Sequence, residues 1–295
     1  MKVKKPITLL AYMKEYIFLI PVFNDWKSLN KLLKKIDENI SMIKGNFKAI
    51  LINDCSTSES KFNISKLKKI KKVHVFNLKK NSGSQKSISI GLRYLKRQKA
   101  KSIITIIDSD GEDDPSKIKN LIELAIKNPK HIITANRLQR NESYFLRFLN
   151  IIRLYVTYLI TGRYIDFGNY TSFQSTNLKN LLSNSNSWLA HPAAVLKNCK
   201  NIKPYYIKKK KRYFGKSHVG FKFLINHSIN IILVFKTEIF TRLIIIYFLS
   251  LIFFSNVFLI TFIMVFILTI LTFIYRKINY NFSRSTNMIS SIKKY

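Results

Sequence analysis

The sequence predicts an α/β fold in which a mainly parallel sheet, covered by helices on both faces, precedes a long apolar segment. Three observations support this class. Short apolar runs alternate with amphipathic stretches between residues 15 and 135, as expected of successive strand–helix–strand units. Acidic residues gather at the end of one of these runs, where such sheets bind ligands. An apolar stretch of 36 residues follows near the C-terminus.

Five apolar runs are typical of buried strands. Helix-like segments separate several of them, which favours parallel pairing, because parallel neighbours need a crossover connection. The predicted strands cover residues 16–23, 47–53, 73–78, 102–108 and 131–135.

Three segments between these runs are predicted to be helices. Apolar residues recur at helical spacing from Trp26 through Ser41, and a second helix is expected from Ser84 to Arg97. A third follows Pro115, a residue that suits the first helical turn because its missing N–H needs no partner there.

The C-terminal third contains a segment that is long and apolar enough to enter a membrane. Residues 239–274 carry one charge, Arg242. A spanning helix needs about 20 apolar residues, and Ser255-Asn256 is a natural turn. Because basic residues flank both ends, the positive-inside rule places both in the cytoplasm. We expect two short transmembrane helices within residues 239–275; a buried core helix is the alternative.

Two further stretches are apolar around most of their circumference. Residues 144–161 are expected to form a helix that either lies on the membrane or packs against the sheet. Residues 221–238 are predicted to be a juxtamembrane amphipathic helix, and residues 276–295 a basic cytoplasmic tail. The domain of residues 1–220 is then expected at the cytoplasmic face of the inner membrane.

The composition argues against nucleic-acid binding. The 51 Lys and Arg residues outnumber the 15 Asp and Glu and give a formal net charge of +36, but lysine is enriched along the whole chain. No basic block alternates with stacking aromatic residues, and no zinc-finger pattern occurs. Two cysteines, Cys55 and Cys199, cannot form a disulfide framework or a metal cage.

Five of the 15 acidic residues lie within seven positions, from Asp108 to Asp114. Asp108 and Asp110 are two residues apart at the end of a strand, so their side chains point the same way. Gly111 permits a turn, and Glu112 adds a third oxygen donor. Because Mg²⁺ binds few protein carboxylates and completes its shell with water and phosphates, the cluster is a candidate metal site. A solvated acidic loop is the alternative.

A series of segments, in order, resembles family 2 inverting glycosyltransferases with the GT-A fold, over about residues 16–277. The likeness is greatest to the branch that contains dolichyl-phosphate mannose synthase and bacterial polyprenyl-phosphate glycosyltransferases. The segments are IPVFNDW (20–26), LINDCSTSE (51–59), NSGSQKSISIGL (81–92), IIDSDGEDDP (106–115), RLQRNES (137–143), DFGNYTSF (166–173) and KRYFGKS (211–217).

The resemblance implies a role for each matching position. A nucleotide-diphosphate sugar would be bound by Pro21, Asn24, Asp54, Asn81, Gly83 and Asp108. A divalent cation, Mg²⁺ or Mn²⁺, would be held by Asp108, Asp110 and Glu112. An acceptor phosphate would meet Arg137, Arg140, Ser143, Arg212 and Lys216. The catalytic residues would be Asp108, Asp110, Arg137 and Arg140.

The sequence departs from that branch at four of these segments' positions. Asn53 replaces the first residue of an Asp-Asp pair, and Cys55 replaces a Gly. Glu112 stands where the branch usually has Gln, and Thr171 where an Arg is common. These differences affect what the resemblance implies about which nucleotide is bound and about part of the phosphate binding.

The scarcity of acids favours a phosphate acceptor. Between Glu142 and Glu238 the only carboxylate is Asp166. A transferase that acts on a sugar hydroxyl needs a general base, whereas a phosphate is already an anion and needs cations such as Arg. We therefore expect transfer to a polyprenyl phosphate of the undecaprenyl or dolichyl type, with anionic lipids as further partners and homo-oligomers left open.

Two alternatives remain at this stage. The same fold could add sugar to a glycan hydroxyl during surface-polysaccharide synthesis, with Asp166 as the only obvious base in the acceptor half. The chain could also be a membrane scaffold with an inactive transferase domain, which the changes at Asn53 and Cys55 keep open.

Overall fold

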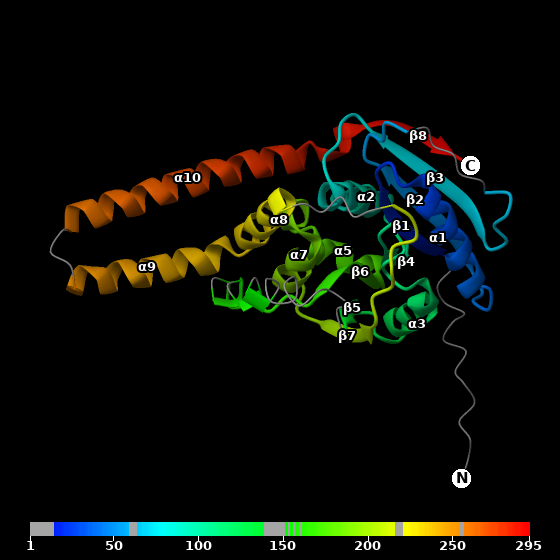
Figure 1. Cartoon of the computed structure of the whole chain (residues 1–295), viewed down its shortest axis with the longest axis horizontal. Helices are drawn as coiled ribbons and strands as arrows, with labels where there is room; N and C mark the ends of the chain where they lie inside the picture. The colour runs from blue at the N-terminus through cyan, green and yellow to red at the C-terminus, as the bar shows by residue number, and fades with distance from the viewer. Residues whose placement is uncertain are drawn as a thin grey trace, which may run out of the picture.

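The computed structural model describes residues 15–58, 64–138, 151–152, 154–155, 157–159, 161–215, 221–253 and 257–295. Helices cover both faces of one eight-stranded sheet, and two long helices project away from it (Figure 1). The structure confirms the α/β class that the alternation of apolar runs and helices predicts.

The sheet has the strand order β7-β5-β6-β4-β1-β2-β3-β8. Its centre, β4-β1-β2-β3, is parallel, and β5 and β7 are also parallel, whereas β6 and β8 run antiparallel to their neighbours. The strands are β1 (Glu15–Val22), β2 (Asn46–Asn53), β3 (Ile70–Leu78), β4 (Ile103–Ile106), β5 (Ile132–Arg137), β6 (Phe167–Gln174), β7 (Ile202–Ile207) and β8 (Ile289–Lys294).

The five predicted strands correspond to β1–β5, and the other three strands were not predicted. The largest difference lies in residues 276–295, which the sequence suggests is a basic tail. In the structure this segment ends in β8, which pairs antiparallel with β3 and places Ile292 opposite Phe76. The strand is short and largely exposed, so its sequence contains no apolar run that would predict it.

Two hydrophobic cores lie on opposite faces of the sheet, because successive side chains of a strand point to opposite sides. Phe18 packs in the core under α1 and α3, while its neighbour Leu19 packs in the core under α2, α5 and α7. The helices of the domain are α1 (Trp26–Asn39), α2 (Ser84–Gln98), α3 (Ile118–Lys127), α5 (Leu178–Leu181), α6 (Asn186–Leu189) and α7 (His191–Asn198).

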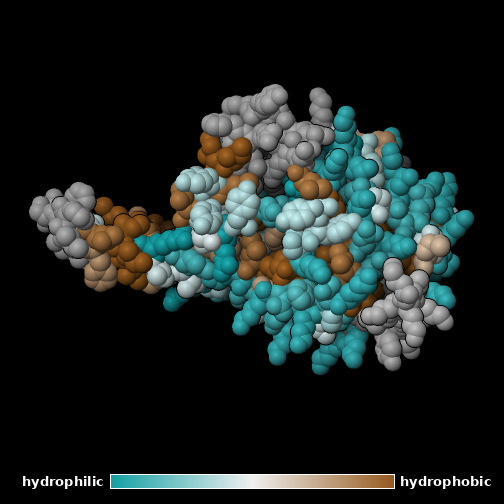
Figure 2. All heavy atoms as spheres, turned by 90° about the horizontal axis from the view of Figure 1, so that it is seen from below, coloured by the Kyte–Doolittle hydropathy of each residue, from teal (hydrophilic) through white to brown (hydrophobic). Residues whose placement is uncertain are grey.

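The projecting arm is formed by α9 (Lys236–Phe253) and α10 (Val257–Ser283), which follow α8 (Phe221–Val234). Apolar side chains cover this arm, whereas hydrophilic residues cover most of the visible face of the domain (Figure 2). Among the described residues, only Phe258–Ser283 is long and apolar enough to cross a membrane.

The predicted pair of spanning helices is therefore not supported. The first turns of α9 contain Lys236, Glu238 and Arg242. Its uncharged part, Leu243–Phe253, has a length of about 17 Å at 1.5 Å per residue, well short of the roughly 30 Å hydrocarbon core.

A buried carboxylate joins α1 to the start of β3. The oxygens of Asp37 accept hydrogen bonds from the backbone N–H groups of Lys68, Lys69 and Ile70, at 2.7, 2.7 and 2.8 Å. These donors would otherwise be unpaired where the chain enters the sheet, so Asp37 fixes the helix against the strand.

We expect Asp37→Ala to lower the free energy of unfolding by about 3 kcal/mol, because three N–H groups lose a charged acceptor. The matched control is Glu38→Ala, which removes only an exposed ion pair with Lys35 and should cost less than about 0.5 kcal/mol. Urea denaturation of the full chain in detergent measures both, and equal losses would contradict this role of Asp37.

Candidate functional site

The candidate site lies at the carboxyl ends of the parallel strands. Asp25, Asp54 and Asp108 follow β1, β2 and β4, which are neighbours in the sheet. Because the carboxyl ends of parallel strands meet at one edge, these acidic residues come from distant parts of the sequence to the same edge.

Asp108 is held by a neutral amide. Asn169 Nδ2, on β6, donates to both carboxylate oxygens of Asp108, at 3.1 and 3.2 Å. The backbone N–H of Asp108 donates to Asp113 at 3.4 Å. Burial raises the pKa of Asp108 well above its usual range, and the charges of Asp113 and Asp110 raise it further.

Asp113 shares this buried environment. Burial raises its pKa as well, and the nearby guanidinium of Arg137 opposes that rise. Arg137 ends β5. Its Nη2 lies against Gly168, and a Cβ on that glycine would be only 3.2 Å from Nη2. These two partly buried carboxylates therefore have a single nearby Arg as their main described counter-charge.

Asp110 and Glu112 contact cations of the segment 208–215, which we name the basic loop. Arg212 Nη1 lies 3.4 Å from Asp110 Oδ2, and the same guanidinium also pairs with Asp25. Lys209 forms an ion pair with Glu112. Burial raises the pKa of Asp110, and the positive charges of Arg212 and Lys209 partly oppose this rise.

The basic loop is also fastened through its backbone. The N–H of Lys210 donates to the Glu112 carbonyl at 2.8 Å, and the N–H of Tyr213 donates to the Asp110 carbonyl at 2.9 Å. Gly111 has φ +83°, and a Cβ there would lie 2.3 Å from the Tyr213 ring. The segment 108–114, which we name the acidic turn, and the basic loop therefore touch at a position where only glycine fits.

Asp54 organises the loop that precedes α2. Its oxygens accept from the N–H groups of Ser82 and Gly83, at 2.8 and 2.7 Å. Burial raises the pKa of Asp54, and these two hydrogen bonds lower it. Gly83 has φ +87° with open space around it, and Asn81 is exposed in the same loop.

Asn24 and Pro21 have mainly structural surroundings. Asn24 Oδ1 accepts from the N–H groups of Thr57 and Ser58, at 2.8 and 3.0 Å, and so holds the loop after β2. Pro21 is buried within β1 opposite Ile52. Both residues lie near the carboxyl end of β1 and support the surface predicted to bind a nucleotide.

Three of the predicted acceptor residues, Arg140, Ser143 and Lys216, lie outside the described residues. Arg137 and Arg212 are described, and both have their guanidinium groups near the carboxylates of the acidic turn. The structure thus brings two predicted phosphate-binding residues to the predicted metal-binding residues.

Sequence reasoning missed the roles of Asn169 and Gln85. Gln85 Nε2 donates to Asn169 Oδ1 at 2.9 Å, which links α2 to the contact with Asp108. Neutral amides 84 residues apart carry no charge pattern, so only the fold brings them together. His191 is fully buried, and its Nε2 lies 3.0 Å from Thr171 Oγ1, in agreement with a core histidine.

The donor chemistry fits a divalent cation at Asp108 and Asp110. Both are hard oxygen donors at the carboxyl edge of the sheet, and Mg²⁺ needs only one or two protein carboxylates. Glu112 is engaged by Lys209 instead. No group of three His, Cys, Asp or Glu residues within the described part of the chain is arranged around a common metal position.

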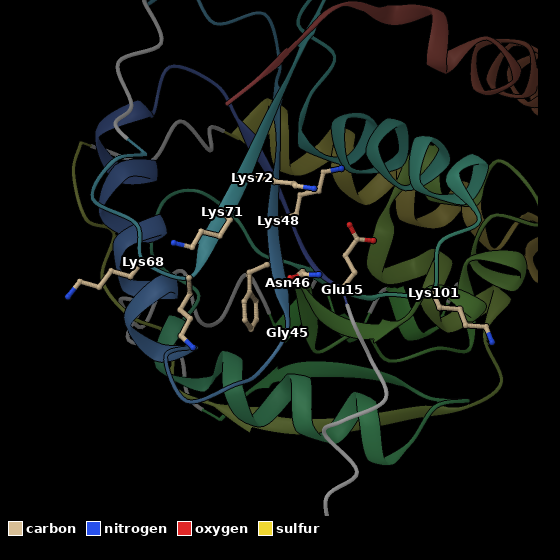
Figure 3. A pocket seen from close by; sticks show the side chains of 10 residues that line it. Glu15, Gly45, Asn46, Lys48, Lys68, Lys71, Lys72 and Lys101 are labelled. Carbon is tan, nitrogen blue, oxygen red and sulfur yellow. The ribbon is translucent and has the colours of Figure 1, made fainter.

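A separate cavity of about 580 Å³ lies at the opposite, amino ends of β1, β2 and β3 (Figure 3). Its polar lining is mostly basic, with Glu15 as the only acid. The lysines that line it are Lys48, Lys68, Lys69, Lys71, Lys72 and Lys101. Because ligands of such sheets bind at the carboxyl ends, this cavity is not the site described above.

Residues 17–187, more than half of the chain, match the family described as Glycosyl transferase family 2. A curated relative, the uncharacterized glycosyltransferase YkcC of Bacillus subtilis (strain 168), is 23% identical over 132 residues. The alignment covers 44% of this chain and 40% of YkcC, so it spans less than half of that relative.

Solved structures show a similar fold. The glucosyl-3-phosphoglycerate synthase of Mycobacterium tuberculosis, in complex with phosphoglyceric acid, is 11% identical with a TM-score of 0.53 and covers 80% of this chain and 86% of its own. A second structure, S. aureus TarS 1–349, is 15% identical with a TM-score of 0.40, and the match covers 66% of this chain and 60% of that solved chain; at this TM-score it adds nothing to the fold assignment. At 11% identity, the likeness to the M. tuberculosis synthase concerns the fold alone.

We expect Gly111→Ala to lower the free energy of unfolding by about 3 kcal/mol, from left-handed backbone strain and overlap with Tyr213. The matched control is Gly215→Ala, which has φ +71° but no atom within 4 Å of a Cβ; strain alone should cost about 1–2 kcal/mol. Denaturant unfolding measures both losses. In a Tyr213→Ala background, Gly111→Ala should cost only the backbone strain, so the difference between the costs at the two glycines should disappear. A difference that persists there would exclude contact with Tyr213 as its cause.

Proposed function

The chain belongs to glycosyl transferase family 2, and from this premise we propose that it is an inverting glycosyltransferase. It moves a sugar from a nucleotide-diphosphate sugar to a polyprenyl phosphate. One observation carries the proposal: the acids Asp108 and Asp110 lie at the carboxyl edge of the sheet beside the cations Arg137 and Arg212. This arrangement suits a reaction in which an anionic leaving group and an anionic acceptor meet.

The donor is assigned to the half of the domain formed by residues 15–135. The loop that Asp54 holds presents the N-terminus of α2, where backbone N–H groups and the helix dipole favour anions. Asn24, Asn81 and Gly83 surround the same edge of the sheet. The M. tuberculosis synthase has been solved with Mn²⁺, UDP-glucose and phosphoglyceric acid, which supports a nucleotide sugar as the donor class.

Asp108 and Asp110 are the residues proposed to hold Mg²⁺ or Mn²⁺. When bound, the cation would neutralise charge on the departing nucleoside diphosphate. Glu112 matches the third metal position of the resemblance, but its contact with Lys209 favours a role in fastening the basic loop. Arg212 pairs with both Asp110 and Asp25. These contacts hold its guanidinium at the same edge of the sheet, where we assign it to binding phosphate oxygens.

The acceptor is assigned to the half formed by residues 136–220. Arg137 offers a planar guanidinium beside the acidic turn, and Arg140, Ser143 and Lys216 are further candidates from the sequence. A phosphate oxygen attacks the anomeric carbon, the bond to the leaving diphosphate breaks, and the configuration inverts. No general base is needed, because the acceptor oxygen carries no proton that must be removed.

The proposed acceptor rests on the resemblance of the sequence to the branch of the family that contains dolichyl-phosphate mannose synthase. A lipid acceptor also agrees with the apolar arm. The segment Phe258–Ser283 is long enough to cross a membrane, and Arg276 and Lys277 lie toward its domain end. The positive-inside rule then favours a cytoplasmic catalytic domain. Because β8 follows α10 and pairs with β3, both ends of the arm join the same sheet, and the arm is proposed to enter the inner membrane from the cytoplasmic face.

We expect Asp108→Asn to reduce sugar transfer by about 100-fold or more, because a transition-state charge loses its stabilisation. The measurement incubates membranes with a panel of radiolabelled nucleotide sugars and follows label into an acid-labile lipid fraction. Glu123→Gln on α3 is the matched loss of one negative charge outside the acidic turn and should leave transfer unchanged. Full turnover of Asp108→Asn would contradict the assignment. Label only outside the lipid fraction would favour the glycan-hydroxyl alternative, and no transfer of any sugar would favour the scaffold alternative.

Asp166→Asn separates a phosphate acceptor from a glycan hydroxyl. Asp166 accepts a 2.7 Å hydrogen bond from Asn136 Nδ2, and an amide oxygen can retain that bond. We expect less than a twofold change in transfer, because a phosphate acceptor requires no base. A loss of about 100-fold or more, the size of a general-base contribution, would favour the hydroxyl acceptor; the total label transferred, counted in both the lipid and the aqueous fraction, measures either result.

A further inference from the structure

Four hydrogen bonds, in three successive contacts, connect the N-terminus of α7 to the carboxylate of Asp108. The backbone N–H of His191 donates to Gln85 Oε1 at 2.6 Å. Gln85 Nε2 donates to Asn169 Oδ1 at 2.9 Å. Asn169 Nδ2 then donates to both oxygens of Asp108. We name this chain of contacts the amide relay.

The direction of the amide relay is fixed by its first member. A backbone N–H can only donate, so the oxygen of Gln85 must face His191. The amide nitrogen of Gln85 must then face Asn169, whose oxygen accepts it. Consequently the nitrogen of Asn169 faces Asp108, and the orientation of both side-chain amides follows from the chemistry of the network.

The surroundings keep the amide relay rigid. Asn169 is 8% exposed and His191 is fully buried. The side chain of His191 is held by Thr171, whose hydroxyl lies 3.0 Å from Nε2. One nitrogen donating to both oxygens of a carboxylate fixes the plane of that carboxylate as well as its position, and a charged acceptor strengthens the contact.

We propose that Asn169 is a positioning residue that holds the Asp108 carboxylate in the orientation for a divalent cation, and that Gln85 sets the direction of its hydrogen bonds. The inference rests on the proposed function, because it assigns Asp108 to cation binding. Partners of this kind orient metal ligands, and losing them typically weakens metal affinity by about 10- to 100-fold.

Gln85→Glu tests the direction of the amide relay. The new carboxylate still accepts from His191 but cannot donate, so Asn169 must turn its nitrogen toward position 85 and its oxygen toward Asp108. The expected result is Mn²⁺ binding weaker by about 10-fold or more. Simple electrostatics predicts the opposite sign, because an added negative charge near the site attracts a cation.

The measurement is calorimetric titration of the full chain in detergent with Mn²⁺ alone, at one pH for all variants. The matched control is Gln98→Glu, the same change at an exposed position of α2, which should leave the affinity unchanged. Asn169→Ala should weaken binding alone, and adding Gln85→Glu to it should weaken binding no further.

Unchanged or tighter Mn²⁺ binding by Gln85→Glu would overturn the proposal, as would an equal loss in the Asn169→Ala background. If the wild-type chain binds no Mn²⁺, the metal assignment of the proposed function fails. The amide relay then has its own readout in a crystal structure of Gln85→Glu. A displaced Asp108 carboxylate supports the positioning role, and an unmoved one overturns it.

Discussion

The structure depends on keeping a group of carboxylates partly buried at the edge of the sheet. Asp108 and Asp113 are partly buried, so their charges need compensation from the protein. Neutral donors, one Arg at the end of β5 and the cations of the basic loop supply it. The acids of a strongly basic chain are therefore concentrated where their charge is needed, and the neighbouring contacts follow from that constraint.

The loops around this edge are held by side chains that the sequence suggested would contact ligand. Both carboxylate oxygens of Asp54 accept hydrogen bonds from backbone N–H groups, and Asn24 holds the loop after β2. Asn53, which replaces a carboxylate of the family pattern, donates to Asn77 Oδ1 at 2.8 Å, and Asn77 donates to Ser291 of β8. The shape of the predicted nucleotide surface therefore depends on a polar ladder that reaches the C-terminal strand.

Much of the sheet could be predicted because β1–β5 are apolar runs separated by helical patterns. β6 could not, since its sequence FGNYTSFQ is buried yet mostly polar; its hydroxyls and amides find partners only across the fold, as Thr105 and Ser172 do at 2.9 Å. The acidic turn was visible because acidic residues are scarce elsewhere. Gln85 and Asn169 were not, because neutral amides become informative only when the fold brings Asn169 of β6 beside Asp108 and Gln85 of α2 beside Asn169.

Net charge alone is a poor guide to which cations matter in this protein. Lys48 and Lys72 line a cavity with one acid, and the pKa of Lys48 is lowered by burial and by its basic neighbours. Lys209 and Arg212 instead lie against carboxylates of the acidic turn. A cation paired with a partly buried acid is already oriented and partly desolvated, so it can exchange that acid for a phosphate at little entropic cost. The pairing, rather than the abundance of lysine, is what makes the carboxyl edge of the sheet suited to anionic substrates.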